Sequence, residues 1–126
     1  MDKKVRWGIL STAIIAREAV IPAMQKPPYA KHAVVEAIAS RSLDKAQATA
    51  QQFGIPRAYG SYEELLADPE IDAVYIPLPN HMHVPYSIKA LEAVKHVLCE
   101  KPISLTVAEG EELIAAGKRF PHLKLM

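Results

Sequence analysis

Residues 5–16 read VRWGILSTAIIA, a stretch that combines a predicted strand, a turn and the start of a predicted helix. Its first half, residues 5–10, is a mostly apolar run that predicts a short strand, which residues 11–12 interrupt. From Ala13 onward the apolar residues recur at helical spacing until a stop at residues 26–28, Lys-Pro-Pro. A strand that passes through small residues directly into a helix is the repeating unit of parallel α/β sheets.

The rest of the chain continues this alternation of strand-like and helix-like segments, without a repeat, a low-complexity tract or a linker. Further strands are predicted at residues 34–39, 57–59, 73–76 and 97–99, and the beginning of another at residues 123–126. Helices are predicted at residues 43–53 and 62–67, from residue 83 or 84 to 94, and from about 107 to 119. This order predicts one α/β domain over residues 1–126, a doubly wound parallel sheet with helices on both faces in three layers.

The charge of the chain is nearly balanced, with 15 basic and 14 acidic side chains and a formal net charge of +1. Because basic residues barely outnumber acidic ones, the composition does not indicate binding to nucleic acid or to an anionic membrane surface. No apolar run approaches the roughly 18 residues that span a bilayer, and residues 1–4 lead into a strand without a signal-peptide core. The single cysteine, Cys99, excludes an internal disulfide framework and a multi-cysteine zinc site. We therefore expect a small cytoplasmic domain that binds a ligand or acts as an enzyme.

Small residues occupy the turn after the first strand, which is where doubly wound sheets bind their ligands. Ser11, Ala13 and Ala16 have the spacing of G-x-G-x-x-G/A, in which small residues allow a tight turn and close approach of the backbone to a pyrophosphate. The N-terminus of the next helix offers N–H groups to the phosphates. Because Ser11 and Ala13 replace two of the usual glycines, an ordinary strand-to-helix turn remains the alternative.

The end of the second predicted strand indicates which dinucleotide such a turn would serve. An acidic residue there would bind the ribose hydroxyls of NAD, but this chain has Ser40, Arg41 and Ser42, with no acid before Asp44. A guanidinium between two hydroxyls suits the 2′-phosphate of NADP. The alternative is that Arg41 is a solvated surface arginine.

Three segments carry a resemblance to a known family. Residues 97–102, VLCEKP, place Glu-Lys-Pro directly after a strand, and residues 80–83, NHMH, form an Asn-x-x-His loop before it. Together with RWGILSTA at residues 6–13, they resemble the Gfo/Idh/MocA oxidoreductase family, in particular its glucose–fructose oxidoreductase and dihydrodiol dehydrogenase-type members. The resemblance implies an N-terminal NAD(P)-binding Rossmann domain, and a C-terminal substrate domain that residues 1–126 do not contain.

The resemblance also implies a role for each matching residue. The residues that it places on the cofactor run from the pyrophosphate through the adenosine end to the nicotinamide: Ser11, Thr12, Ala13, Ile15, Ser40, Arg41, Pro77, Leu78, Asn80, His83, Glu100 and Lys101. Lys101 would also be the catalytic residue, beside the reacting hydroxyl or carbonyl group, and the proline after it is often cis in the family. The implied cofactor is NADP, with NAD as the alternative.

Lys101 also has a chemical argument of its own. Hydride transfer from an alcohol leaves a developing carbonyl group, and a nearby ammonium stabilises the charge on its oxygen and helps to relay its proton. The sequence therefore predicts part of an NADP(H)-preferring oxidoreductase whose substrate is a sugar, a polyol or a related hydroxyl or carbonyl compound. The alternative is a stand-alone nucleotide-binding or self-associating Rossmann module without catalysis. Methyl transfer from S-adenosylmethionine is disfavoured, because it would prefer an acidic residue where Arg41 stands.

Four smaller features complete these predictions. His81 and His83 have no third ligand nearby, so no metal site is predicted. Cys99 follows apolar strand residues and is expected to be a buried, inert thiol. Val94 stands where the family usually has glycine, at the end of a helix. Apolar surface that a second domain would cover predicts self-association, that is, a homo-oligomer.

Overall fold

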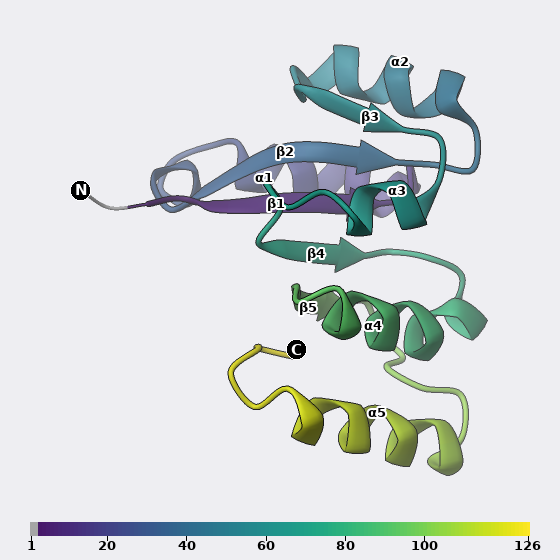
Figure 1. The fold of residues 1–126 in the computed structure, drawn as a ribbon. Helices are drawn as coiled ribbons and strands as arrows, with labels where there is room; N and C mark the ends of the chain where they lie inside the picture. Colours follow the sequence, from purple (N-terminus) through teal and green to yellow (C-terminus); the bar gives the residue numbers. More distant parts are fainter. Residues whose placement is uncertain (1–2) are drawn as a thin grey trace.

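Strand β1 (Val5–Leu10) lies at the centre of a sheet of five parallel strands (Figure 1). The structure is a computed structural model, and it describes residues 3–126. The strand order is β3-β2-β1-β4-β5, where the other strands are β2 (Ala33–Ala39), β3 (Arg57–Tyr59), β4 (Ala73–Ile76) and β5 (His96–Cys99). Because the order runs outward from β1 in both directions, the switch point of the sheet lies between β1 and β4.

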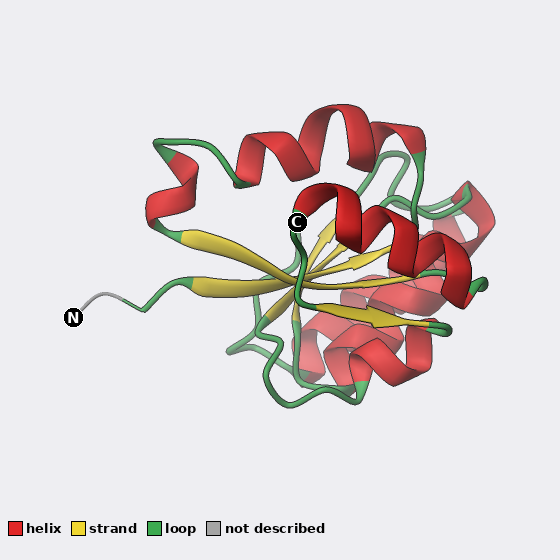
Figure 2. Cartoon of the chain, turned by 90° about the horizontal axis from the view of Figure 1, so that it is seen from above, coloured by secondary structure: helices red, strands yellow, loops and turns green. Residues whose placement is uncertain are grey.

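Helices cover both faces of this sheet (Figure 2). Buried residues of α1 (Ile21–Met24) and α2 (Leu43–Phe53) join one apolar cluster. Those of α3 (Tyr62–Leu66), α4 (His83–Glu92) and α5 (Val107–Arg119) join the other. The remaining helical segments are η1 (Ala16–Val20), η2 (Tyr29–Lys31) and η3 (Asn80–Met82). This arrangement confirms the predicted three-layer, doubly wound α/β sheet.

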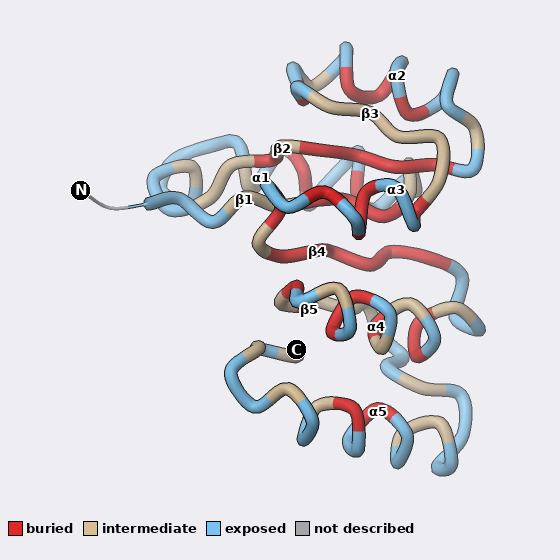
Figure 3. The backbone as a smooth tube through the Cα atoms, in the orientation of Figure 1, coloured by how far each residue is buried: buried red, intermediate tan, exposed pale blue. Residues whose placement is uncertain are grey.

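The central strands are buried on both faces, as Figure 3 shows for β4 and for most of β2. Successive residues of β4 enter opposite clusters, with Tyr75 on the side of α1 and Ile76 on the side of α4. Gly8 in β1 allows α3 to approach the sheet closely, because a Cβ atom at this position would lie 2.5 Å from Leu65 Cδ2. The sheet thus separates two apolar clusters, one on each of its faces.

Hydroxyl side chains cap three helices, and two of these caps belong to the capping-box patterns Ser61–Glu64 and Thr106–Glu109 of the sequence. Ser42, Ser61 and Thr106 each accept a hydrogen bond from a backbone N–H in the first turn of the following helix, at 3.3, 3.2 and 3.1 Å. These bonds satisfy N–H groups that have no partner within the helix, and they fix the starts of α2, α3 and α5. Gly54 ends α2 with φ of 66°, the left-handed conformation that glycine adopts readily.

The first helix differs from the regular α-helix that the sequence predicted. Its middle segment, η1, is a π-helical turn, in which the N–H of Ile21 donates to the carbonyl oxygen of Ala16. Pro22 gives the physical reason, because it lacks an N–H and its ring would clash with the carbonyl of Glu18 in a regular α-helix. A wider turn before the proline avoids this clash.

Helix α4 ends at Glu92, earlier than the predicted end at Val94. Val94 lies just beyond it, with φ of 62° and a side chain that is 60% exposed. A β-branched side chain is strained in this left-handed conformation, whereas glycine is not. The position therefore has the backbone that favours the glycine expected there from the resemblance.

We expect Val94→Gly to raise the free energy of unfolding by about 1 kcal/mol, because it removes backbone strain and almost no buried surface. Urea-induced unfolding measures this change. Val107→Gly is the matched control, since it removes an exposed valine from regular helix α5, and it should lower the stability. A decrease for Val94→Gly would contradict the assignment of strain to this turn.

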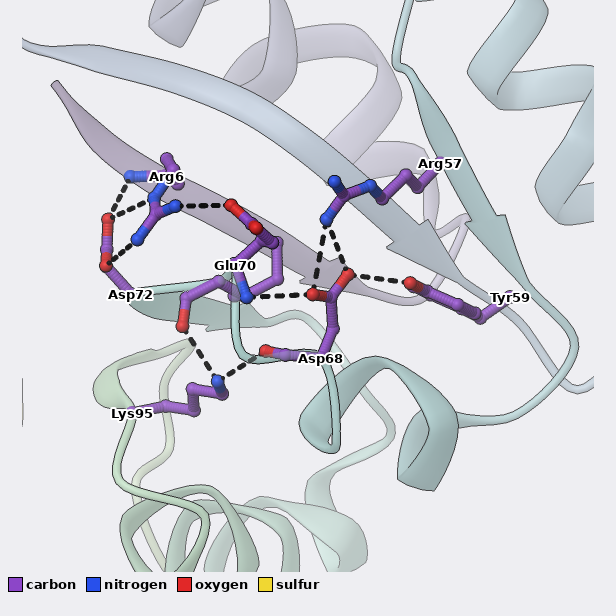
Figure 4. Close-up of polar contacts among 8 residues, drawn as sticks. Arg6, Arg57, Tyr59, Asp68, Glu70, Asp72 and Lys95 are labelled. Carbon is purple, nitrogen blue, oxygen red and sulfur yellow. Dashed lines mark hydrogen bonds and ion pairs between the residues drawn. The ribbon is translucent and has the colours of Figure 1, made fainter.

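Lys95 follows this turn and is buried, with only 4% of its surface exposed. Its Nζ atom donates hydrogen bonds to the carbonyl oxygens of Asp68 at 2.6 Å and Ile71 at 2.8 Å (Figure 4). Burial lowers the pKa of Lys95. The Asp68 carboxylate in turn accepts hydrogen bonds from Tyr59 Oη at 2.6 Å and from Arg57 Nη1 at 2.9 Å. These bonds tie the end of α4 and strand β3 to the loop that precedes β4.

The sequence predicts the beginning of a strand at residues 123–126, and the structure has only an isolated bridge to β5 there. Leu125 forms an isolated parallel bridge with Val97. The N–H of Val97 donates to Lys124 at 2.8 Å, and the N–H of Met126 donates to Val97 at 2.9 Å. Across residues 3–126, the structure contains no helix with the length and apolar character needed to cross a bilayer.

Candidate functional site

A cleft of about 510 Å³ lies at the carboxyl ends of the central strands, next to the switch point of the sheet. It brings together the turn after β1, the turn after β2, the start of α3 and the loop after β4. Its lining residues are Ser11, Thr12, Ser40, Arg41, Ser42, Lys45, Tyr62, Pro79, His81 and Met82. Four residues placed on the cofactor by the sequence analysis thus meet in one cleft: Ser11, Thr12, Ser40 and Arg41.

The turn after β1 has the backbone of a glycine turn although it contains no glycine. Ser11 has φ of 139°, and its Oγ accepts a hydrogen bond of 3.0 Å from the N–H of Ala13. Arg17, in the first helix, donates from Nε to the carbonyl oxygen of Thr12 at 2.8 Å. The turn therefore presents the N-terminus of a helix and a hydroxyl group to the cleft, both of which favour an anion.

The turn after β2 supplies most of the cleft's positive charge. Ser40 is buried, and its Oγ accepts a hydrogen bond of 3.2 Å from the N–H of Ser42. Arg41 is exposed on the cleft wall, and Lys45 joins it from the first turn of α2. Two cations and several hydroxyl groups thus lie at one end of the cleft, with no carboxylate among the lining residues that the structure describes.

Lys45 and Tyr62 line the cleft, although neither was predicted as a site residue. Lys45 had a local signal, because a helix capped by Ser42 places its first turn beside Arg41. Tyr62 had none, because it belongs to α3, a separate element. Burial raises the pKa of Tyr62, and the Arg41 guanidinium opposes this rise, as expected where the two side chains face each other.

The loop after β4 reaches the cleft through residues other than those expected. Pro79, His81 and Met82 line it, whereas Pro77 and Leu78 are buried and Asn80 is exposed outside the lining. These positions follow from the short helix η3, which carries the chain outward before α4 begins.

His83 is buried at the start of α4, with 1% of its surface exposed, and does not line the cleft. Its Nδ1 lies 2.6 Å from the carbonyl oxygen of Pro102, and its Nε2 lies 2.8 Å from that of Leu78. The ring therefore bridges the loop after β4 and the loop after β5.

The Glu-Lys-Pro segment follows β5, two strands away from β1 in the sheet, and lies outside the cleft lining. Glu100 accepts a hydrogen bond from Tyr75, and its N–H donates to Ile76 at 3.1 Å. Lys101 is exposed, and the Lys101-Pro102 peptide bond is cis, as the resemblance implied. Ala13 and Ile15, in the turn after β1, also lie outside the lining.

Two further predictions concern metal binding and Cys99. No group of three or more His, Cys, Asp or Glu side chains is placed to hold a metal ion within residues 3–126. Cys99 is half-buried, and its burial raises the pKa of the thiol, which makes the thiolate form less accessible.

A parallel sheet in this order, with an anion-favouring cleft at its switch point, defines a dinucleotide-binding α/β domain. Residues 5–121 match the family described as "Oxidoreductase family, NAD-binding Rossmann fold". The chain belongs to this family, the Gfo/Idh/MocA oxidoreductases.

Relatives and solved structures agree with this membership. The chain is 62% identical over 115 residues to the uncharacterized oxidoreductase ORF334 of Rhizobium meliloti, covering 91% of this chain and 34% of that protein. It is 50% identical over 103 residues to D-xylose 1-dehydrogenase (NADP(+)) 2 of Haloferax volcanii, and the match covers 82% of this chain and 30% of that protein. The chain also superposes on the crystal structure of KijD10, a 3-ketoreductase from Actinomadura kijaniata in complex with TDP-benzene and NADP, with a TM-score of 0.89 and 37% identity. This match covers 98% of the present chain and 38% of KijD10. The chain spans about a third of the length of these proteins.

Proposed function

We propose that this chain binds NADP(H), as the cofactor-binding domain of an oxidoreductase that transfers hydride between nicotinamide and a sugar, a polyol or a related hydroxyl or carbonyl compound. The observation that carries the proposal is the meeting of Arg41 with Ser40 and Ser11 in one cleft at the switch point. The D-xylose dehydrogenase and the 3-ketoreductase support it, since their names couple NADP to sugar or ketone chemistry.

The residues present fit a 2′-phosphorylated dinucleotide. Arg41 and Lys45 offer cations to the 2′-phosphate, and the hydroxyls of Ser40 and Ser42 add hydrogen-bonding groups. The turn at Ser11 would hold the pyrophosphate at the N-terminus of the first helix. NAD lacks the 2′-phosphate, so we expect it to bind the same cleft more weakly.

The chemistry of the reaction belongs to the loop after β5. When bound, nicotinamide supplies the hydride acceptor or donor. Lys101 would hold its ammonium beside the reacting oxygen, where it stabilises developing negative charge and relays the proton. We propose this role for Lys101 because its side chain is exposed at the carboxyl end of β5, directly after Glu100.

The exposure of Lys101 also favours a second candidate function for this chain alone. A catalytic ammonium works best where water is excluded, and Lys101 is open to solvent here. A chain that binds the nucleotide without catalysing hydride transfer would have the same cleft. An assay for NADPH oxidation with ketose and aldose substrates separates the two candidates, since only the first predicts turnover.

Calorimetric titration of the chain with NADPH and, separately, with NADH tests the proposed function. We expect saturable binding of both, with NADPH tighter. Binding of neither cofactor would contradict the proposal, and tighter binding of NADH would contradict the role of Arg41.

We further propose that the chain self-associates through α5 and the loop before it. Val107 and Ile114, seven positions apart on the outer face of α5, are 79% and 60% exposed, and Leu105 lies exposed beside them. Light scattering should show a mass that rises with protein concentration, and Ile114→Lys should reduce this rise. A monomer at every concentration would contradict the prediction.

A cytoplasmic location is proposed from the single, half-buried cysteine.

A further inference from the structure

Tyr75, in the middle of β4, forms a hydrogen bond with the loop that follows β5. Its side chain is buried, with 2% of the residue exposed, and its hydroxyl donates to Glu100 Oε2 at 2.6 Å. This distance is typical of a hydroxyl that donates to a carboxylate. Glu100 directly precedes Lys101, so Tyr75 contacts the segment that carries the proposed catalytic residue.

The register of the sheet produces this contact. Tyr75 pairs with Leu98 of β5, and Glu100 follows two positions later, on the same face of the sheet. The N–H of Glu100 also donates to the carbonyl oxygen of Ile76. Both the backbone and the side chain of Glu100 are therefore fixed to β4, although Glu100 itself lies beyond the end of β5.

The surroundings of Tyr75 make this hydrogen bond rigid. Its ring packs in the apolar cluster that contains Ile9 and Ala16, with Leu98 against the same cluster. Burial and the Glu100 carboxylate both raise the pKa of Tyr75, so its hydroxyl stays protonated and remains a donor. Within residues 3–126, the second carboxylate oxygen, Glu100 Oε1, has no hydrogen-bond partner.

We propose that Tyr75 is a positioning residue that holds one oxygen of Glu100, so that the other oxygen accepts a hydroxyl group of the nicotinamide ribose. Tyr75 acts only through Glu100 and does not touch the cofactor. The inference rests on the proposed function, because it assigns the nicotinamide half of the cofactor to the carboxyl end of β5.

Tyr75→Phe tests the proposal with two probes that share the adenosine end of the cofactor. NADPH contains the nicotinamide ribose, and adenosine 2′,5′-bisphosphate does not. We expect Tyr75→Phe to weaken NADPH binding about fivefold, a size typical of coupled neighbours, and to leave adenosine 2′,5′-bisphosphate binding unchanged. Calorimetric titration measures both affinities, and circular dichroism verifies the fold of each variant.

Tyr59→Phe is the matched control. It removes a hydroxyl that also donates to a carboxylate oxygen at 2.6 Å, but this carboxylate belongs to Asp68, outside the cleft. We expect this variant to keep the wild-type ratio of the two affinities. A purely structural effect of losing a tyrosine hydroxyl would change both variants alike.

A double-mutant cycle shows whether Tyr75 acts through Glu100. Glu100→Ala should weaken NADPH binding, and Tyr75→Phe should add no further loss in that background. Additive losses, or an equal loss for both probes, would overturn the proposal, and so would unchanged NADPH binding by Tyr75→Phe. If the wild-type chain binds neither probe, the proposed function itself fails and this inference fails with it. If it binds the bisphosphate but not NADPH, the adenosine site stands, but the proposed binding of NADP(H) and this inference both fail. If it binds both probes and Tyr75→Phe changes neither affinity, the inference alone is overturned.

Discussion

Replacing Lys95 with methionine is expected to lower the free energy of unfolding by about 3 kcal/mol, the largest effect on stability that we predict. Methionine keeps most of the unbranched stem and its packing, so the loss comes from the ammonium group. Without that group, the carbonyl oxygens of Asp68 and Ile71 lose a buried donor. Urea-induced unfolding of both proteins measures the difference.

The control for this substitution is Lys89→Met. Lys89 lies on α4 with a half-exposed side chain and a 3.5 Å ion pair to Glu63, and exposed pairs of this kind contribute little. We expect its stability to remain within about 0.5 kcal/mol of the wild type. Equal losses for the two variants would contradict the special role of Lys95.

The pH dependence of the same pair of proteins provides a second readout. Burial lowers the pKa of Lys95 in the folded state, so the unfolded chain binds more protons in the range between that value and the ordinary lysine value. The stability of the wild type relative to Lys95→Met should therefore rise as the pH rises through this alkaline range. A difference that is constant with pH, measured by urea unfolding, would show that burial does not perturb the ammonium.

Arg41→Ala is expected to weaken NADPH binding about 30-fold while leaving NADH binding nearly unchanged. The guanidinium would contact only the 2′-phosphate, which NADH lacks. Calorimetric titration of the variant with both cofactors gives the ratio of affinities. Arg119→Ala is the control, since it removes a surface arginine of α5, and it should alter neither affinity.

Equal losses of NADPH and NADH for Arg41→Ala would contradict the assignment of the 2′-phosphate. Such a result would mean that Arg41 acts on a part of the cofactor that both dinucleotides share. Loss of the fold would appear in the circular dichroism spectrum, but the exposed position of Arg41 makes such a loss unexpected.

Local signals made most of the fold predictable. The caps at Ser42, Ser61 and Thr106 depend on residues within one turn, so short patterns locate the helices that follow them. The burial of Lys95 has no such signal, because its two acceptors lie in a loop more than twenty residues earlier in the chain. The π-helical turn was also not predicted, since the sequence shows Pro22 but not how the helix accommodates it.

The candidate site was predictable where strand ends meet. Ser11 and Ser40 each follow a strand of the central sheet, and parallel strands bring their carboxyl ends to one edge. The roles implied for all twelve residues placed on the cofactor, and the catalytic role of Lys101, stay predictions, because they concern contacts with a cofactor and a substrate. The burial of His83 depends on carbonyl groups from two separate loops, which no local pattern encodes.

Lys95 and the two carbonyl oxygens that it binds lie before β5, at the opposite end of the strands from the cleft beside Arg41. Substitutions that adapt the cleft to a different nucleotide therefore leave the bonds that secure α4 and the loop before β4 untouched. An engineer can thus exchange Ser40, Arg41 and Lys45 as a set, for example to make the domain accept NADH as a cheaper coenzyme, without removing the hydrogen bonds that Lys95 makes.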